Sequence, residues 1–188
     1  MLDRNRLASH LQTFPRQIIP AESLRPAAVL IPLFQRGGRG YLLFTERTAH
    51  LEHHAGESSF PGGGFHPGDA DLSATALRET EEELGIPQVQ VSVLGRLDDF
   101  YSVHGYHVVP FVGLIPQPDN LQLDPFEIAG SFEAPVDHFR DPAVHRVEDW
   151  QHRGRTHLVN FYQFEKHVIW GLTAAILRQF IEETVDLF

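Results

Sequence analysis

The chain has 188 residues, an ordinary hydrophobic content of 42% and a formal net charge of −10 at pH 7. This length and composition predict a single domain over 1–188 with a substantial apolar core. The negative charge argues against nucleic acid or an anionic membrane as a partner, because contacts with phosphate groups on such surfaces require a basic face. The absence of cysteine excludes disulfide bonds and thiolate chemistry.

No apolar run follows the first residues, and no stretch approaches the roughly twenty apolar residues of a membrane-spanning helix. We therefore expect no signal peptide, no membrane association and a cytoplasmic location. A chain without disulfide bonds is compatible with the reducing cytoplasm. A monomer and a homodimer both remain open.

The hydrophobic pattern predicts a mixture of strands and helices. An amphipathic helix over 2–14 precedes an apolar strand over 27–34, and a glycine-rich turn allows the strand over 41–46 to pair back against it. This mixture predicts an α+β or α/β sandwich. Further along the chain we expect strands over 89–100, 107–115 and 130–134, a short helix over 125–129, a hairpin over 144–150 and 157–164, and a helix over 168–183.

A helix that follows the first two strands has the clearest boundaries in the chain. Apolar and small residues recur at helical spacing from Leu72 to Leu84. Asp69 and Asp71 are candidate N-caps, and Gly85 is a stop signal.

Three carboxylates, Glu79, Glu82 and Glu83, fall on one side of this helix, because residues three and four apart share a face. Like charges so close together repel, and oxygen ligands of this kind suit Mg²⁺ or Mn²⁺. Arg78 can reach Glu82 at i+4 spacing and orient it. The alternative interpretation is an ordinary solvated acidic face. The glycine run over 62–64, just before the helix, favours the metal site.

The segment 64–86 resembles the Nudix box, Gly-x5-Glu-x7-Arg-Glu-U-x-Glu-Glu-x-Gly-U, in which U is aliphatic. Two positions depart: Ala70 stands where Glu is expected, and Thr80 replaces the aliphatic residue. The resemblance implies the Nudix fold, an α/β/α sandwich around a mixed sheet, and metal-dependent hydrolysis of a nucleoside diphosphate linked to another group. The positions that match the box are Gly64, Arg78, Glu79, Glu82, Glu83, Gly85 and Ile86.

A second segment, Leu42 to Gly63, resembles the signature of the coenzyme A pyrophosphatase branch of this family, Leu-Leu-Thr-x-Arg-(Ser/Ala)-x3-Arg-x3-Gly-x3-Phe-Pro-Gly-Gly. Thr48 stands where Ser or Ala is expected, and Glu52 stands where an Arg is expected. Weaker similarity to the branch extends the match over 25–185. The positions that match the signature in register are Thr45, Arg47, Gly56 and the run Phe60 to Gly63.

The resemblance implies roles for individual residues. Glu79, Glu82 and Glu83 would supply carboxylates to the metal, and a backbone carbonyl near Gly63 would complete its shell. One of these glutamates, or Glu127, would act as a base toward water. Glu127 is equally well explained as an ordinary charge at the start of the short helix predicted over 125–129.

Two further features are candidates for substrate binding. Arg47 would clamp phosphate, with an ion pair to a neighbouring acid as the alternative. Gly62, Gly63 and Gly64 would let the backbone approach phosphate without a side-chain clash.

The expected substrate is therefore a small nucleotide, coenzyme A or an acyl-coenzyme A, cleaved to 3′,5′-ADP and (acyl-)4′-phosphopantetheine. Two alternatives stay open. One is hydrolysis of another nucleotide such as ADP-ribose, NADH or a nucleoside triphosphate. The other is a catalytically weak nucleotide-sensing domain, against which the three glutamates of the helix argue.

Overall fold

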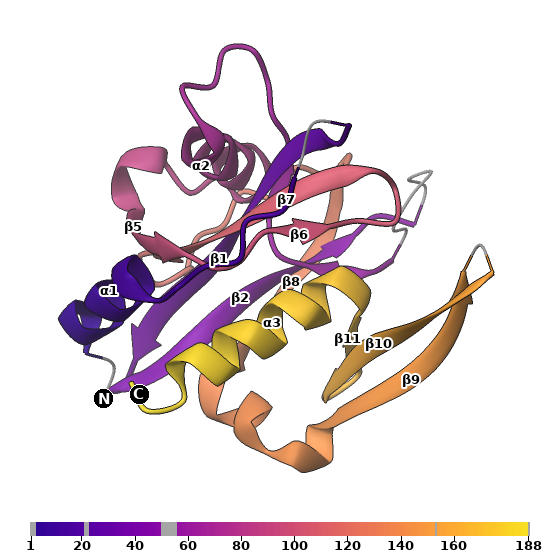
Figure 1. Ribbon diagram of the computed structural model, residues 1–188. Coiled ribbons are helices and arrows are strands. Elements are labelled where there is room, and N and C mark those ends of the chain that lie inside the picture. The colour runs from indigo at the N-terminus through magenta and orange to yellow at the C-terminus, as the bar shows by residue number, and fades with distance from the viewer. Residues whose placement is uncertain (1–2, 21–22, 50–55, 153, 188) are drawn as a thin grey trace.

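A computed structural model describes residues 3–20, 23–49, 56–152 and 154–187, and shows a mixed sheet with helices on both faces (Figure 1). This confirms the predicted fold class. The helices and strands, in chain order, are α1 (Arg4–Thr13), β1 (Arg25–Arg36), β2 (Arg39–Arg47), β3 (Ser58–Ser59), β4 (Gly62–Gly64), α2 (Leu72–Leu84), β5 (Ser92–Arg96), β6 (Phe100–Tyr101), β7 (Tyr106–Leu114), β8 (Ile128–Pro135), β9 (His145–His152), β10 (Arg155–Phe164), β11 (His167–Trp170) and α3 (Gly171–Thr184).

Strand β1 is the centre of the main sheet. It pairs parallel with β7 and antiparallel with β2, in the order β3-β2-β1-β7-β5. The glycine strand β4 pairs with β1, and β8 pairs with β2. Because both faces of β1 are covered, its middle is almost continuously apolar rather than alternating.

The two faces of the sheet build separate cores. On one face Leu30 and Phe34 of β1 pack with Leu84 of α2. On the other face Ile31 and Leu33 of the same strand pack with residues of α1 and α3. This division follows from the alternation of side chains along a strand. It places α2 alone on one side of the sheet (Figure 1).

The boundaries predicted for α2 are confirmed. Asp71 is the N-cap, and its side chain accepts a hydrogen bond from the backbone N–H of Ala74 at 2.8 Å. Gly85 ends the helix in the left-handed conformation with φ 69°. A side chain at that position would also meet Gln122 Cβ at 2.7 Å, so both the left-handed backbone and the lack of space favour glycine.

One predicted helix is wrong, and another begins later in the chain than predicted. Residues 168–170 belong to strand β11, which pairs with β10, so the last helix begins only at Gly171. No helix forms over 125–129: a turn leads directly into β8, and the backbone N–H and hydroxyl of Thr48 donate to the carbonyls of Glu127 and Phe126. The strand predicted over 89–100 is also shorter, and is confined to β5 and the first residue of β6. Within the described residues, no helix is both long and apolar enough to cross a membrane.

Candidate active site

The glycine run lies directly against the carboxylates of α2. Pairing of β4 with β1 sets Gly63 opposite Ala28. Helix α2 contacts both of these strands. A Cβ atom on Gly63 would lie 2.6 Å from Oε1 of Glu79. Only glycine therefore allows this carboxylate to rest on the backbone of the loop.

Arg78 ties this loop to the helix. Its guanidinium lies 2.9 Å from Asp69 Oδ1, 2.8 Å from Glu82 Oε2 and 2.8 Å from Glu79 Oε1. It also donates to the Gly64 carbonyl at 3.1 Å. The Arg78 guanidinium holds the pKa of Asp69 well below its usual range. The predicted contact with Glu82 is confirmed, whereas Asp69 serves as a partner of Arg78 rather than as the helix cap.

Glu83 is the buried member of the acidic set, with 3% of its surface exposed. Burial raises the pKa of Glu83 to about 8, against the opposing effect of Arg47. The neighbouring Glu79 and Glu127 charges raise this pKa further. Oε2 of Glu83 is buried and has no hydrogen-bond partner among the described atoms. Such an oxygen is costly to leave unsatisfied, which makes it the strongest sign of a ligand site here.

Arg47 links Glu83 to Glu127. Its Nη1 lies 3.6 Å from Glu83 Oε1, and its Nη2 lies 3.6 Å from Glu127 Oε2. The backbone N–H of Thr48 donates a hydrogen bond to the Glu127 carbonyl, which places Glu127 next to the end of β2. Glu127 therefore belongs to the acidic site. Since no helix starts there, the interpretation of Glu127 as a helix-terminal charge is wrong.

The comparisons with known proteins decide the family. The NUDIX domain model matches residues 24–161. The chain belongs to the Nudix family. This Nudix protein is 41% identical over 179 residues to an uncharacterized Nudix hydrolase, NudL, of Photorhabdus laumondii subsp. laumondii, covering 95% of this chain and 94% of the relative. NudL of Yersinia pestis (strain Pestoides F) is 43% identical over 159 residues, 85% of this chain and 79% of the relative.

Solved structures agree with the Nudix fold. A MutT/nudix family protein from Enterococcus faecalis superposes with a TM-score of 0.55 at 16% identity, covering 97% of this chain and 69% of that chain. The Nudix hydrolase RenU from M. smegmatis superposes with a TM-score of 0.53 at 18% identity, covering 86% of each chain. These distant structures show the fold alone. The match to the NUDIX domain model and the similarity to NudL make the protein a Nudix hydrolase, an enzyme for a nucleoside diphosphate derivative, and Nudix hydrolases generally use divalent metal ions.

The carboxylates of this Nudix hydrolase are near one another but not assembled into one cluster. No three histidine, aspartate or glutamate side chains of the described residues gather closely enough to hold a metal ion. Each of the three glutamates of α2 is paired with an arginine: Glu79 and Glu82 contact Arg78, and Glu83 lies against Arg47. The donor chemistry nevertheless fits a hard divalent cation, because a buried carboxylate oxygen of Glu83 has no partner and the Glu79 carboxylate is adjacent to the glycine loop.

Glu52 lies outside the described residues. The Asp69–Arg78 pair was missed as a site feature, because these residues come from a loop and a helix and no sequence period links them.

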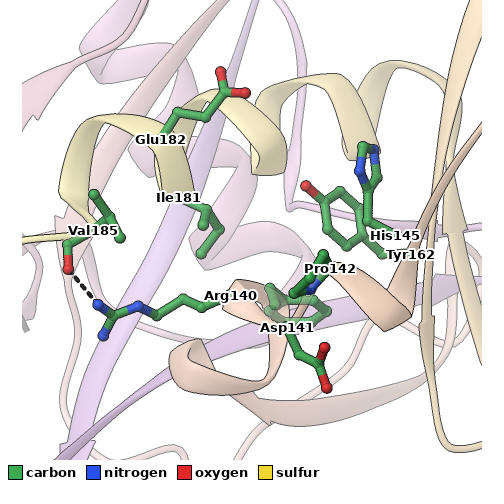
Figure 2. Close-up of a pocket in the computed structure, with 9 residues that line it drawn as sticks. Arg140, Asp141, Pro142, His145, Tyr162, Ile181, Glu182 and Val185 are labelled. Atoms are coloured by element: carbon green, nitrogen blue, oxygen red, sulfur yellow. Dashed lines mark hydrogen bonds between the residues drawn. The ribbon is translucent and has the colours of Figure 1, made fainter.

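A pocket elsewhere in the molecule is unrelated to the acidic site. It has a volume of about 390 Å³ and is lined by residues of β10 and α3 and by the segment before β9. Figure 2 shows Arg140 reaching across it to donate to the Val185 carbonyl at 2.6 Å. His145 stacks on Tyr162 with ring centroids 4.5 Å apart. None of the predicted site residues lines this pocket.

Proposed function

We propose that this Nudix hydrolase cleaves the pyrophosphate bond of coenzyme A or acyl-coenzyme A, giving 3′,5′-ADP and (acyl-)4′-phosphopantetheine. One observation carries the proposal: Arg47, from the segment that resembles the coenzyme A signature, lies 3.6 Å from Glu83 of the Nudix box. The segment that resembles the coenzyme A signature and the segment that resembles the Nudix box therefore meet at this contact.

Glu79, Glu82, Glu83 and the Gly63 carbonyl would hold Mg²⁺ or Mn²⁺. When bound, such a cation neutralises charge that develops on the phosphate oxygens. The unpartnered Oε2 of Glu83 supports this assignment, and so does the contact of Glu79 with Gly63.

Glu127 is the proposed base. Its side chain is 47% exposed, whereas that of Glu83 is almost fully buried, so water reaches Glu127 more readily. Two carboxylates in such different environments suit different tasks: Glu83 stays in place as a ligand, and Glu127 accepts the proton of the attacking water.

Arg47 is the proposed phosphate clamp. Both of its contacts with carboxylates are 3.6 Å long, and its buried Nε has no hydrogen-bond partner among the described atoms. A phosphate group would offer this guanidinium the shorter, bidentate contacts that it prefers. Next to it, Gly62, Gly63 and Gly64 offer backbone that a phosphate can approach.

A product-resolved screen with Mg²⁺ and Mn²⁺ tests the substrate. It should include coenzyme A, acetyl-coenzyme A, ADP-ribose, NADH and ATP. We expect the highest kcat/KM with coenzyme A or its ester. A higher kcat/KM with ADP-ribose or NADH would favour the second candidate, a pyrophosphatase for another nucleoside diphosphate derivative, which the Glu in place of Arg at position 52 supports.

Position 52 gives that second candidate its own test. An Arg there would suit the 3′-phosphate of coenzyme A, and a Glu would not. Glu52→Arg should therefore lower KM for coenzyme A more than for dephospho-coenzyme A. An equal effect on both substrates would mean that residue 52 does not read the 3′-phosphate.

A further inference from the structure

A second pocket, of about 510 Å³, opens between the end of β2 and the small sheet β9–β10–β11 that lies beside α3 (Figure 1). One wall is aromatic and consists of Trp150, Phe161 and Trp170. The polar part of the lining includes two carboxylates, Glu46 and Glu57, together with Lys166 and His167. Its volume is within the range of small-molecule sites.

The aromatic wall consists of two partly exposed tryptophans, whose rings are tilted by 37° to each other, and the buried Phe161. Trp150 and Trp170 have ring centroids 5.2 Å apart, and Trp170 stacks on Phe161 with an interplanar angle of 9°. The other face of the same sheet supplies Tyr162 and Ile169 to the core. Trp150 is 42% exposed, so a substantial part of its surface remains accessible to a ligand. An exposed aromatic surface of this kind suits the stacking of a planar ring.

The pocket adjoins the acidic site through neighbouring residues of β2. Glu46 lines the pocket, and Arg47 contacts Glu83 on the opposite face of the strand. The backbone of Arg47 is hydrogen-bonded to two pocket-lining residues, since its N–H donates to Glu57 O at 3.0 Å and its carbonyl accepts from Gly56 N at 3.1 Å. A ligand that passes around this end of β2 would contact both places.

Charge decides which end of a nucleotide would enter. Carboxylates repel phosphate groups but accept hydrogen bonds from amino groups, and Glu46 and Glu57 both line this pocket. Lys166 also lines it but is an exposed residue, so the two carboxylates leave the lining negatively charged. His167 holds the Glu46 carboxylate in place at 3.0 Å from its Nδ1. A base with an exocyclic amine is thus favoured inside, while the phosphates remain on the Arg47 side.

We propose that this pocket binds the adenine base of the substrate, stacked on Trp150 and Trp170. The inference rests on the proposed function only in that the substrate is an adenine nucleotide. Coenzyme A, ADP-ribose and NADH all satisfy that condition.

The chain contains two tryptophans, Trp150 and Trp170, and both line the pocket. Tryptophan fluorescence therefore reports on this pocket alone. AMP should be titrated into the full-length protein in the presence of EDTA, so that the readout depends on neither metal nor turnover. We expect a saturable fluorescence change with AMP and none with ribose 5-phosphate, which lacks the base.

Trp150→Ala should weaken AMP binding about tenfold, as expected for the loss of one stacking partner, with Trp170 as the remaining reporter. The matched control is Leu158→Ala. Leu158 is 73% exposed and pairs with Asp149, next to Trp150, on the opposite face of the same hairpin. This variant should bind AMP like the wild type. Circular dichroism of both variants should match that of the wild type.

Several results would overturn the adenine pocket. They are an equal response to ribose 5-phosphate, wild-type AMP affinity in Trp150→Ala, and dissociation of a dimer by this substitution with AMP affinity unchanged. The last result would assign the aromatic wall to an interface between copies of the chain. Failure of the two proposals can be told apart. Loss of AMP binding in Trp150→Ala, without any hydrolysis of coenzyme A by the wild type, supports the pocket and rejects the coenzyme A proposal.

Discussion

Nη1 of Arg47 lies 3.6 Å from Oε1 of Glu83, and this contact joins the end of β2 to the C-terminal end of α2. Glu83 is otherwise enclosed by the sheet and the helix. The pair therefore fixes the position of the arginine that we propose as phosphate clamp, while Arg47 only partly opposes the effect of burial on the pKa of Glu83.

Replacement of Glu83 by Gln tests its role in metal binding. An amide of the same shape cannot neutralise a divalent cation, so turnover at saturating Mg²⁺ should fall by about two orders of magnitude or more. The matched control is Glu81→Gln, an exposed residue of the same helix, which should retain wild-type turnover. Near wild-type activity in Glu83→Gln would remove Glu83 from the metal site.

The raised pKa of Glu83 makes stability depend on pH. Between its ordinary value of 4.5 and its folded value of about 8, the folded state binds more protons than the unfolded state. The stability of the wild type should therefore fall as pH rises through this window. Relative to Glu83→Gln, the loss should be on the order of 3 kcal/mol.

Chemical denaturation of both proteins in EDTA at pH 5, 6.5 and 8 measures this difference. Added Mg²⁺ should reduce it, because a bound cation favours the carboxylate form. If the free energies of unfolding of the two proteins in EDTA change in parallel with pH, the pKa of Glu83 is not raised.

Adjacent glycines provide a steric test. In Gly63→Ala the new methyl group would displace the Glu79 carboxylate, from which it would lie 2.6 Å away. We expect a cost of about 1–3 kcal/mol in the free energy of unfolding and a loss of most activity. In Gly64→Ala the methyl group meets no protein atom within 4 Å, so the free energy of unfolding should stay close to that of the wild type. Equal behaviour of the two variants would separate the glycine loop from Glu79.

Arg78→Lys keeps the charge but loses the planar fork that contacts Asp69, Glu79 and Glu82 together. Thermal unfolding should show a loss of about 1–3 kcal/mol. Arg178→Lys disturbs a single exposed pair with Glu182 and should cost no more than about 0.5 kcal/mol. If the two substitutions cost the same, Arg78 does not organise the loop.

Glu127→Gln should lower kcat more than it raises KM, since a base acts on the chemical step. Stability should change little, because the side chain is 47% exposed. Steady-state kinetics across pH 6–9 distinguish this from a binding role. A raised KM with unchanged kcat would assign Glu127 to substrate binding instead.

Local signals in the sequence were sufficient for α2, since Asp71 and Gly85 fix its ends through contacts within the helix and its caps. Local signals failed where pairing with a strand distant in the sequence determines the secondary structure. Residues 168–170 are apolar enough for a helix, and only pairing with β10 makes them a strand. In the same way the shared face of Glu79, Glu82 and Glu83 and the Arg78–Glu82 pair were predictable from helical spacing, whereas the contacts of Arg47 with Glu83 and of Arg78 with Asp69 depend on tertiary packing.

The identity of the products from coenzyme A tests the central claim most directly. Mass spectrometry of a reaction with Mg²⁺ should show 3′,5′-ADP and 4′-phosphopantetheine in equal amounts for the wild type and Glu81→Gln, and neither product for Glu83→Gln. Intact coenzyme A with the wild type, under conditions in which ADP-ribose or NADH is hydrolysed, would contradict the proposed substrate.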